Sequence, residues 1–139
     1  MYKLAIIPSV FVFVILGCGR PEAVQLAGTW RIKETSKRIL SAELNSTQSE
    51  IALNANGSFT AHSLPGLFEN PPRRLRLDGG SGVWKLVRRE GEYQVQLDFQ
   101  MDGGPFSFPL KVSRGWSKTT LFYFLGDPDE GLRVDFEKN

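Results

Sequence analysis

The sequence predicts an all-β protein, a small antiparallel up-and-down barrel of about eight strands. Apolar and polar residues alternate in short runs, which is the pattern of half-buried strands. Turn-forming residues separate these runs, and the 139 residues include 14 glycines and 8 prolines. Most gaps between runs are too short for the crossover that parallel neighbours need, so successive strands should pair antiparallel. A closed barrel is favoured over two packed sheets because closure removes exposed strand edges.

The first seventeen residues are expected to form a signal peptide. Lys3 supplies a positive start, and an apolar run follows from Leu4 to Leu16, interrupted only by Pro8 and Ser9. A run of this length matches a signal-peptide core and is shorter than the roughly 20 residues that a membrane-spanning helix needs. We therefore expect residues 1–17 to be removed.

The signal core ends in Ile15-Leu16-Gly17-Cys18, and Cys18 is the only cysteine of the chain. These four residues resemble the lipobox of bacterial lipoproteins. The resemblance implies cleavage before Cys18 and a diacylglyceryl thioether on its sulfur, so the membrane is one expected partner. Gly19 follows where an Asp would retain enteric lipoproteins at the inner membrane, which points to the outer membrane facing the periplasm. The alternative is a secreted protein whose signal peptide happens to contain a cysteine.

The mature chain is expected to consist of a tether over residues 18–27 and a single β-barrel domain over residues 28–139. The predicted strands cover 28–34, 49–53, 58–63, 81–88, 92–99, 105–113, 119–125 and 132–138. The clearest turn is Asn54-Ala55-Asn56-Gly57, because Asn-Gly adopts the positive φ of a tight hairpin. Residues 35–47 have loosely helical spacing and predict a short helix after the first strand. Residues 64–80, with three prolines, predict a long loop.

The first strand opens with Gly28-Thr29-Trp30, which resembles the Gly-x-Trp motif of lipocalin-like proteins. The resemblance implies an eight-stranded barrel with Arg133 of the last strand packed on Trp30. Trp30 and Arg133 are therefore candidate ligand or core residues, and Trp84, one of the many aromatic residues expected to fill the barrel, is a third. A small apolar or amphipathic ligand inside the barrel is the function that this resemblance favours.

The sequence predicts no catalytic residues, no metal site and no cofactor. One His and one Cys cannot build a multi-thiolate or paired-imidazole metal site, and no Ser occupies a Gly-x-Ser-x-Gly elbow. The segment Gly126-Asp-Pro-Asp-Glu-Gly131 contains the acidic residues Asp127 and Asp129; it is interpreted as a turn, with contact to a cation or a partner as the alternative. A net charge of only +2 argues against nucleic acid as a partner.

Two sets of residues are candidates for surface contact. One is a basic set that the sequence places in a single positive region: Arg73, Arg74 and Arg76, with Arg88 and Arg89 near it. It is interpreted either as a solvated loop or as a contact for anionic lipid headgroups or an acidic partner. The other set is aromatic, since Phe68 and Trp116 fall outside the predicted strands. These surfaces support the alternative function, a protein-interaction or inhibitor module that acts through its loops.

Overall fold

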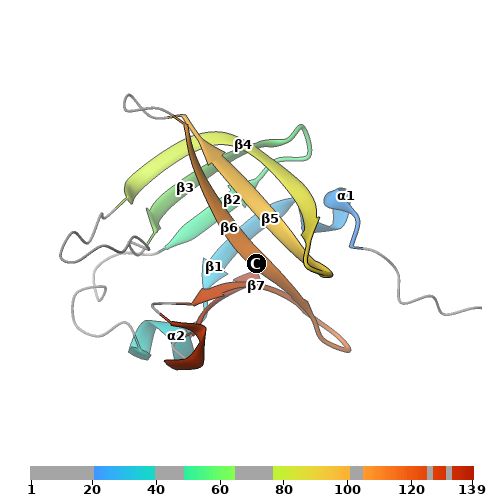
Figure 1. Ribbon diagram of the computed structural model, residues 1–139. Helices are drawn as coiled ribbons and strands as arrows, with labels where there is room; N and C mark the ends of the chain where they lie inside the picture. The colour runs from blue at the N-terminus through green and yellow to red at the C-terminus, as the bar shows by residue number, and fades with distance from the viewer. Residues whose placement is uncertain (1–20, 40–48, 65–76, 101–104, 125–126, 131–132) are drawn as a thin grey trace, which may run out of the picture.

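The computed structural model describes residues 21–39, 49–64, 77–100, 105–124, 127–130 and 133–139. Within these ranges, two short helices and one 3-10 turn accompany the strands (Figure 1). In chain order the elements are α1 (Ala23–Leu26), β1 (Gly28–Ile32), α2 (Glu34–Ile39), β2 (Glu50–Leu53), β3 (Ser58–Leu64), β4 (Leu77–Arg89), β5 (Glu92–Phe99), β6 (Phe106–Arg114), β7 (Thr119–Phe124), η2 (Pro128–Glu130) and β8 (Arg133–Lys138).

The eight strands form one closed antiparallel barrel, which confirms the predicted fold class. Each strand pairs with the next along the chain, and β1 pairs with β8 to complete the ring. In this closing pair Trp30 faces Lys138 and Ile32 faces Phe136. The architecture is consistent with a lipocalin-like barrel. The described part of the chain contains no helix that is long and apolar enough to cross a bilayer.

Alternation along the strands determines which side chains face the interior. In β5, for example, Val95, Leu97 and Phe99 are buried, whereas the residues between them are partly exposed. The inward side chains of all eight strands form a single apolar cluster together with Leu26 of α1. The core therefore occupies the barrel interior.

The strands run between two ends of the barrel, which we name after the helices beside them. The α1 end contains α1 and three short turns: β2–β3, β4–β5 and β6–β7. The α2 end contains α2, η2 and the longer connections, including those from β3 to β4 and from β5 to β6. Figure 1 shows α1 and the β6–β7 turn on one side of the molecule and α2 on the other.

Most described strand boundaries lie within two residues of the predicted ones, and two differences are larger. Strand β4 begins at Leu77, so residues 77–80 belong to the sheet and not to the predicted loop of residues 64–80. The predicted tether of residues 18–27 is shorter than expected, because Pro21 is already buried and residues 23–26 form α1. The short helix predicted after the first strand is present as α2.

Candidate functional site

Trp30 closes the α1 end of the barrel from inside. Its side chain is completely buried, and the indole Nε1 donates a hydrogen bond of 2.8 Å to the carbonyl oxygen of Leu26. Leu26 is itself buried, so α1 lies across this end with its last residue in the core. Trp30 thus connects the strand that begins the barrel to the helix that covers its end.

Lys138, and not Arg133, lies over Trp30. The ammonium nitrogen of Lys138 is 6.0 Å from the centroid of the Trp30 ring and donates a 2.9 Å hydrogen bond to the carbonyl oxygen of Gln25. The aliphatic stem of Lys138 passes directly over Gly28, where a Cβ atom would clash with it. Gly28 also has φ of +138°, a backbone conformation that favours glycine whatever the space around it.

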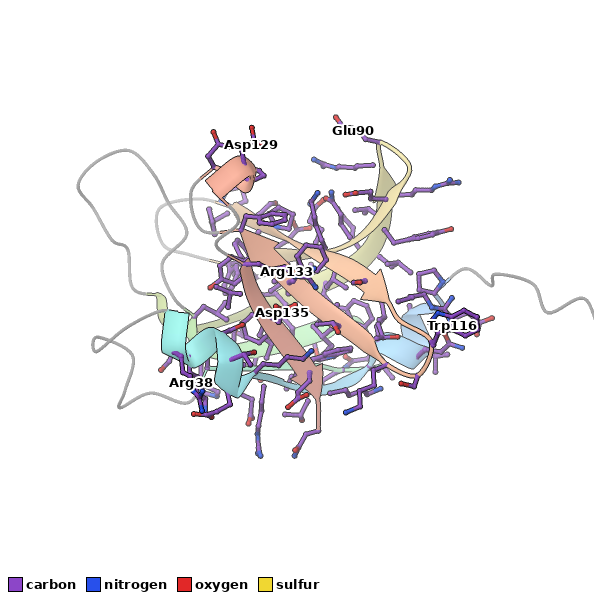
Figure 2. The ribbon with its side chains drawn as sticks, turned by 90° about the horizontal axis from the view of Figure 1, so that it is seen from below. Arg38, Glu90, Trp116, Asp129, Arg133 and Asp135 are labelled. Carbon is purple, nitrogen blue, oxygen red and sulfur yellow. The ribbon has the colours of Figure 1, made fainter. Side chains whose placement is uncertain are left out.

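Arg133 occupies the outer face of the barrel, so its expected packing on Trp30 is wrong. Its guanidinium carbon lies 3.6 Å from the centroid of the Phe122 ring, and its Nη2 forms a 2.6 Å ion pair with Asp135. Figure 2 shows Arg133 and Asp135 following one another along β8. The physical reason is geometric: Trp30 pairs with Lys138, at the opposite end of β8 from Arg133, and residues 133 and 135 point outward.

Trp84 also belongs to the core. It is almost fully buried, and its Nε1 donates a 2.8 Å hydrogen bond to the carbonyl oxygen of Asn54 in the β2–β3 turn. The indole nitrogens of Trp30 and Trp84 are therefore both used by main-chain carbonyls of the barrel's own α1 end. Both candidate ligand residues therefore stabilise the α1 end from inside the barrel.

Aromatic rings fill much of the interior in two groups. In the first, Phe99 contacts Phe59 edge to face at 4.8 Å between ring centroids and Phe106 at 5.9 Å. In the second, Tyr123 contacts Phe108 at 5.5 Å and Phe136 at 6.1 Å. Burial raises the pKa of the Tyr123 phenol well above its ordinary value, because ionisation would place a charge among these rings. The interior around Tyr123 therefore favours uncharged groups.

Trp116 has the opposite environment. It is fully exposed, with a relative accessibility of 109%, at the tip of the β6–β7 turn. The turn is closed by a 2.8 Å hydrogen bond from the Gly115 amide to the Lys118 carbonyl oxygen. Figure 2 shows Trp116 projecting at the side of the barrel where the pale blue α1 and β1 lie. Trp116 is thus a large aromatic group displayed to the surroundings by an ordered turn at the α1 end.

Of the basic residues predicted to form one region, the structure describes Arg88 and Arg89, which lie on β4. Arg88 and Arg89 end this 13-residue strand at the α1 end, whereas its first residue, Leu77, lies at the α2 end. At about 3.3 Å per residue, the strand spans roughly 40 Å. Arg88 lies over the ring of Tyr93 at 5.7 Å, and both arginines are exposed. They therefore belong with the exposed groups of the α1 end.

The acidic turn is organised by its own backbone. The Asp127 carboxylate accepts a 2.9 Å hydrogen bond from the Asp129 amide, and residues 128–130 form the 3-10 turn η2. Both aspartates are exposed at the α2 end, and Figure 2 shows Asp129 there. Over the described ranges, no three His, Cys, Asp or Glu side chains gather where a metal ion could bind.

A polar network on the outer face surrounds Asp98 of β5. Its carboxylate accepts hydrogen bonds from Ser107 at 2.5 Å and Gln96 at 2.7 Å, and Lys85 forms an ion pair with it at 3.3 Å. The hydrogen bonds from Gln96 and Ser107 lead in lowering the Asp98 pKa, with Lys85 adding to them. The network joins β4, β5 and β6 from outside.

Some of the predicted residues lie outside the described ranges: Cys18, Phe68, Arg73, Arg74 and Arg76. The structure therefore leaves their roles as predictions. Conversely, the sequence analysis missed Lys138 and Leu26. Lys138 was detectable by strand parity, since it shares a face of β8 with Val134 and Phe136. Leu26 was not, because a four-residue helix is too short for a periodic signal.

Comparisons with known proteins assign no relationship: no family model, curated protein or solved structure matches the chain.

Proposed function

We propose that the protein is a lipid-anchored, non-enzymatic binding module of a bacterial cell envelope, which acts through the surface of a filled barrel. The anchor is the thioether on Cys18 implied by the lipobox resemblance, and the outer membrane facing the periplasm is the proposed location. The observation that carries the surface-acting role is the interior packing. The inward aromatic rings contact one another, and both inward tryptophans use their N–H groups on the barrel's own backbone.

The partner of such a module is proposed to be another envelope protein, met at the α2 end. The long connections from β3 to β4 and from β5 to β6 start and finish there. Long connections on a rigid scaffold are the usual position of binding residues. The exposed Asp127 and Asp129 of this end would favour a partner surface with basic groups.

A small apolar ligand is the second proposal, and the observation that favours it is Phe106. This residue begins β6 at the α2 end, packs against the core and is only partly buried. Its ring contacts Phe99, which continues into the interior. A ligand would therefore enter from the α2 end and lie against these two rings.

Native mass spectrometry of residues 19–139, followed by solvent extraction, separates the two proposals. The surface-acting role predicts a single mass equal to that of the polypeptide. A reproducible co-purified lipid or metabolite would contradict it and support the ligand-binding role. In that case Phe106→Ala should lower the bound fraction, whereas Phe122→Ala, an outward aromatic on β7, should leave it unchanged.

The anchor has a separate test, made on the full chain in a bacterial host. Wild-type protein should yield a mature chain that begins at a diacylated Cys18, and Cys18→Ala should leave unprocessed precursor. Membrane-bound mature protein of normal mass from Cys18→Ala would contradict the lipoprotein proposal.

A further inference from the structure

We propose that the β6–β7 turn inserts Trp116 into the anionic headgroup region of the bilayer to which the chain is anchored. The inference rests on the proposed anchor at Cys18 and specifies which part of the barrel touches the membrane. It assigns a role to an exposed tryptophan that the fold itself does not use.

The first argument is the contrast among the three tryptophans. Trp30 and Trp84 have relative accessibilities of 0% and 6%, whereas that of Trp116 is 109%. Full exposure of an indole leaves a large apolar surface in water, with its N–H group at the edge. Tryptophan is enriched at membrane–water interfaces because its ring favours the apolar side and its N–H the wet side. The closed turn keeps Trp116 at the tip.

The second argument is the length of chain between the anchor and the barrel. Pro21 is the first described residue and is buried, so the chain is already part of the barrel at this position. Pro21 is only three positions after Cys18, and even a fully extended chain would span only about 11 Å over that distance. The α1 end must therefore lie close to the lipid headgroups once Cys18 is acylated. Trp116 projects at this same end.

The third argument is the charge of the hairpin. No Asp or Glu occurs between residues 103 and 126, a stretch that includes all of β6, the turn and β7. The same stretch contains Lys111, Arg114 and Lys118. Lys111 forms a 2.8 Å ion pair with Glu92 of β5, whereas Lys118 is exposed two residues after Trp116. Cations beside an interfacial tryptophan match the negative surface of an anionic bilayer.

Other exposed groups of the α1 end agree with this orientation. Val24, on the outer side of α1, has a relative accessibility of 67% and lies six residues after Cys18. Arg88 and Arg89 are exposed at the adjacent end of β4. The α1 end thus presents two apolar groups, Trp116 and Val24, together with the exposed cations Arg88, Arg89 and Lys118. Exposed carboxylates of Glu22, Glu90 and Glu92 lie at the same end, so Lys118, on the turn beside Trp116, is the charge expected to meet the bilayer.

The test uses lipidated mature protein, purified from membranes and reconstituted into vesicles of phosphatidylcholine and phosphatidylglycerol. The vesicles are prepared with and without brominated acyl chains, which quench tryptophan at short range. Subtracting the spectrum of Trp116→Ser from that of the wild type isolates Trp116, because the other two tryptophans are buried. We expect this difference signal to be quenched in brominated vesicles. Lys118→Glu should reduce the quenching, and the reduction should grow with the phosphatidylglycerol fraction.

A matched control places tryptophan at the opposite end of the barrel. Arg38 is exposed on α2, far from Trp116 in Figure 2, so Arg38→Trp in the Trp116→Ser background should escape quenching. Equal quenching at both positions would show an unoriented barrel and overturn the inference. Arg38→Glu is the charge control for Lys118→Glu and should leave the wild-type signal unchanged.

The mass of the reconstituted protein distinguishes the two levels of the proposal. An unlipidated mature chain would remove the anchor, and this inference with it. A lipidated chain whose Trp116 signal is the same in plain and brominated vesicles would leave the anchor standing and overturn the inference alone. A Trp116 signal that shifts to shorter wavelength only in native membranes, and not in pure lipid, would assign the turn to a protein partner and also overturn it.

Discussion

Replacement of Trp30 tests a buried position that links β1 to α1. The residue is fully buried and holds α1 through the hydrogen bond from Nε1 to the Leu26 carbonyl. Truncation of a buried tryptophan to alanine costs about 3–5 kcal/mol of unfolding free energy. Trp30→Phe keeps most of the ring but removes the N–H group, and an ordinary hydrogen bond contributes about 0.5–1.5 kcal/mol. We expect Trp30→Phe to lower the free energy of unfolding by about 0.5–1.5 kcal/mol. Trp30→Ala should lower it by about 3–5 kcal/mol.

The assay is guanidinium unfolding of residues 19–139, followed by far-ultraviolet circular dichroism so that loss of a tryptophan does not alter the signal. Trp116→Ala is the matched control, and its free energy of unfolding should stay within about 0.5 kcal/mol of the wild type because the side chain is exposed. A loss below about 1 kcal/mol for Trp30→Ala would be no larger than a typical substitution and would refute the closing role.

Three further substitutions test the packing and the titrating groups. Gly82→Ala should unfold the barrel or shift β4, since a Cβ atom there would overlap the Asp98 carbonyl of β5; a thermal transition equal to that of the wild type would contradict this. Hydrogen bonds lower the Asp98 pKa in the folded protein. The ionised carboxylate therefore adds to the free energy of unfolding above the unfolded pKa of 3.8, and this stabilisation is lost as pH falls. The stability difference between wild type and Asp98→Asn should therefore shrink in denaturant melts below pH 4; a constant difference would count against it. Burial raises the Tyr123 pKa, so stability is lost as pH rises above the unfolded value of 10.0. Tyr123→Phe should flatten that alkaline loss, and an unchanged alkaline profile would show that Tyr123 is not its source.

The sequence predicted the barrel well because strand alternation directly encodes the inner and outer faces. Runs such as residues 92–99 alternate clearly, and short turns leave only antiparallel neighbours. The start of β4 was missed because Leu77-Asp78-Gly79-Gly80 has the composition of a loop. In the barrel, Gly80 is required for another reason, since a Cβ atom there would meet the ring of Phe99. Such a tertiary contact has no local signal.

The candidate site was less predictable. The Gly-x-Trp motif correctly indicated that Trp30 is important, but its partner depends on the register of β1 against β8. That register places Lys138 beside Trp30 and leaves Arg133 outside on Phe122. The position of Arg88 and Arg89 at the opposite end of β4 from Leu77 likewise depends on the true length of this strand, 13 residues. The sequence places Trp116 outside the strands. Which end of the barrel Trp116 occupies follows only from the strand topology.

The β1–β8 pairing has a consequence for how the chain folds. Seven of the eight strand pairings join neighbours in the sequence and can form as local hairpins, whereas β1 and β8 come from opposite ends of the domain. This contact has the largest sequence separation, so its entropy cost makes it a slow step in folding. While the seam is open, two strand edges are free to pair with a second chain. Arg31, Glu137 and Lys138 place charges along these edges, and charged edge strands are a common protection against aggregation.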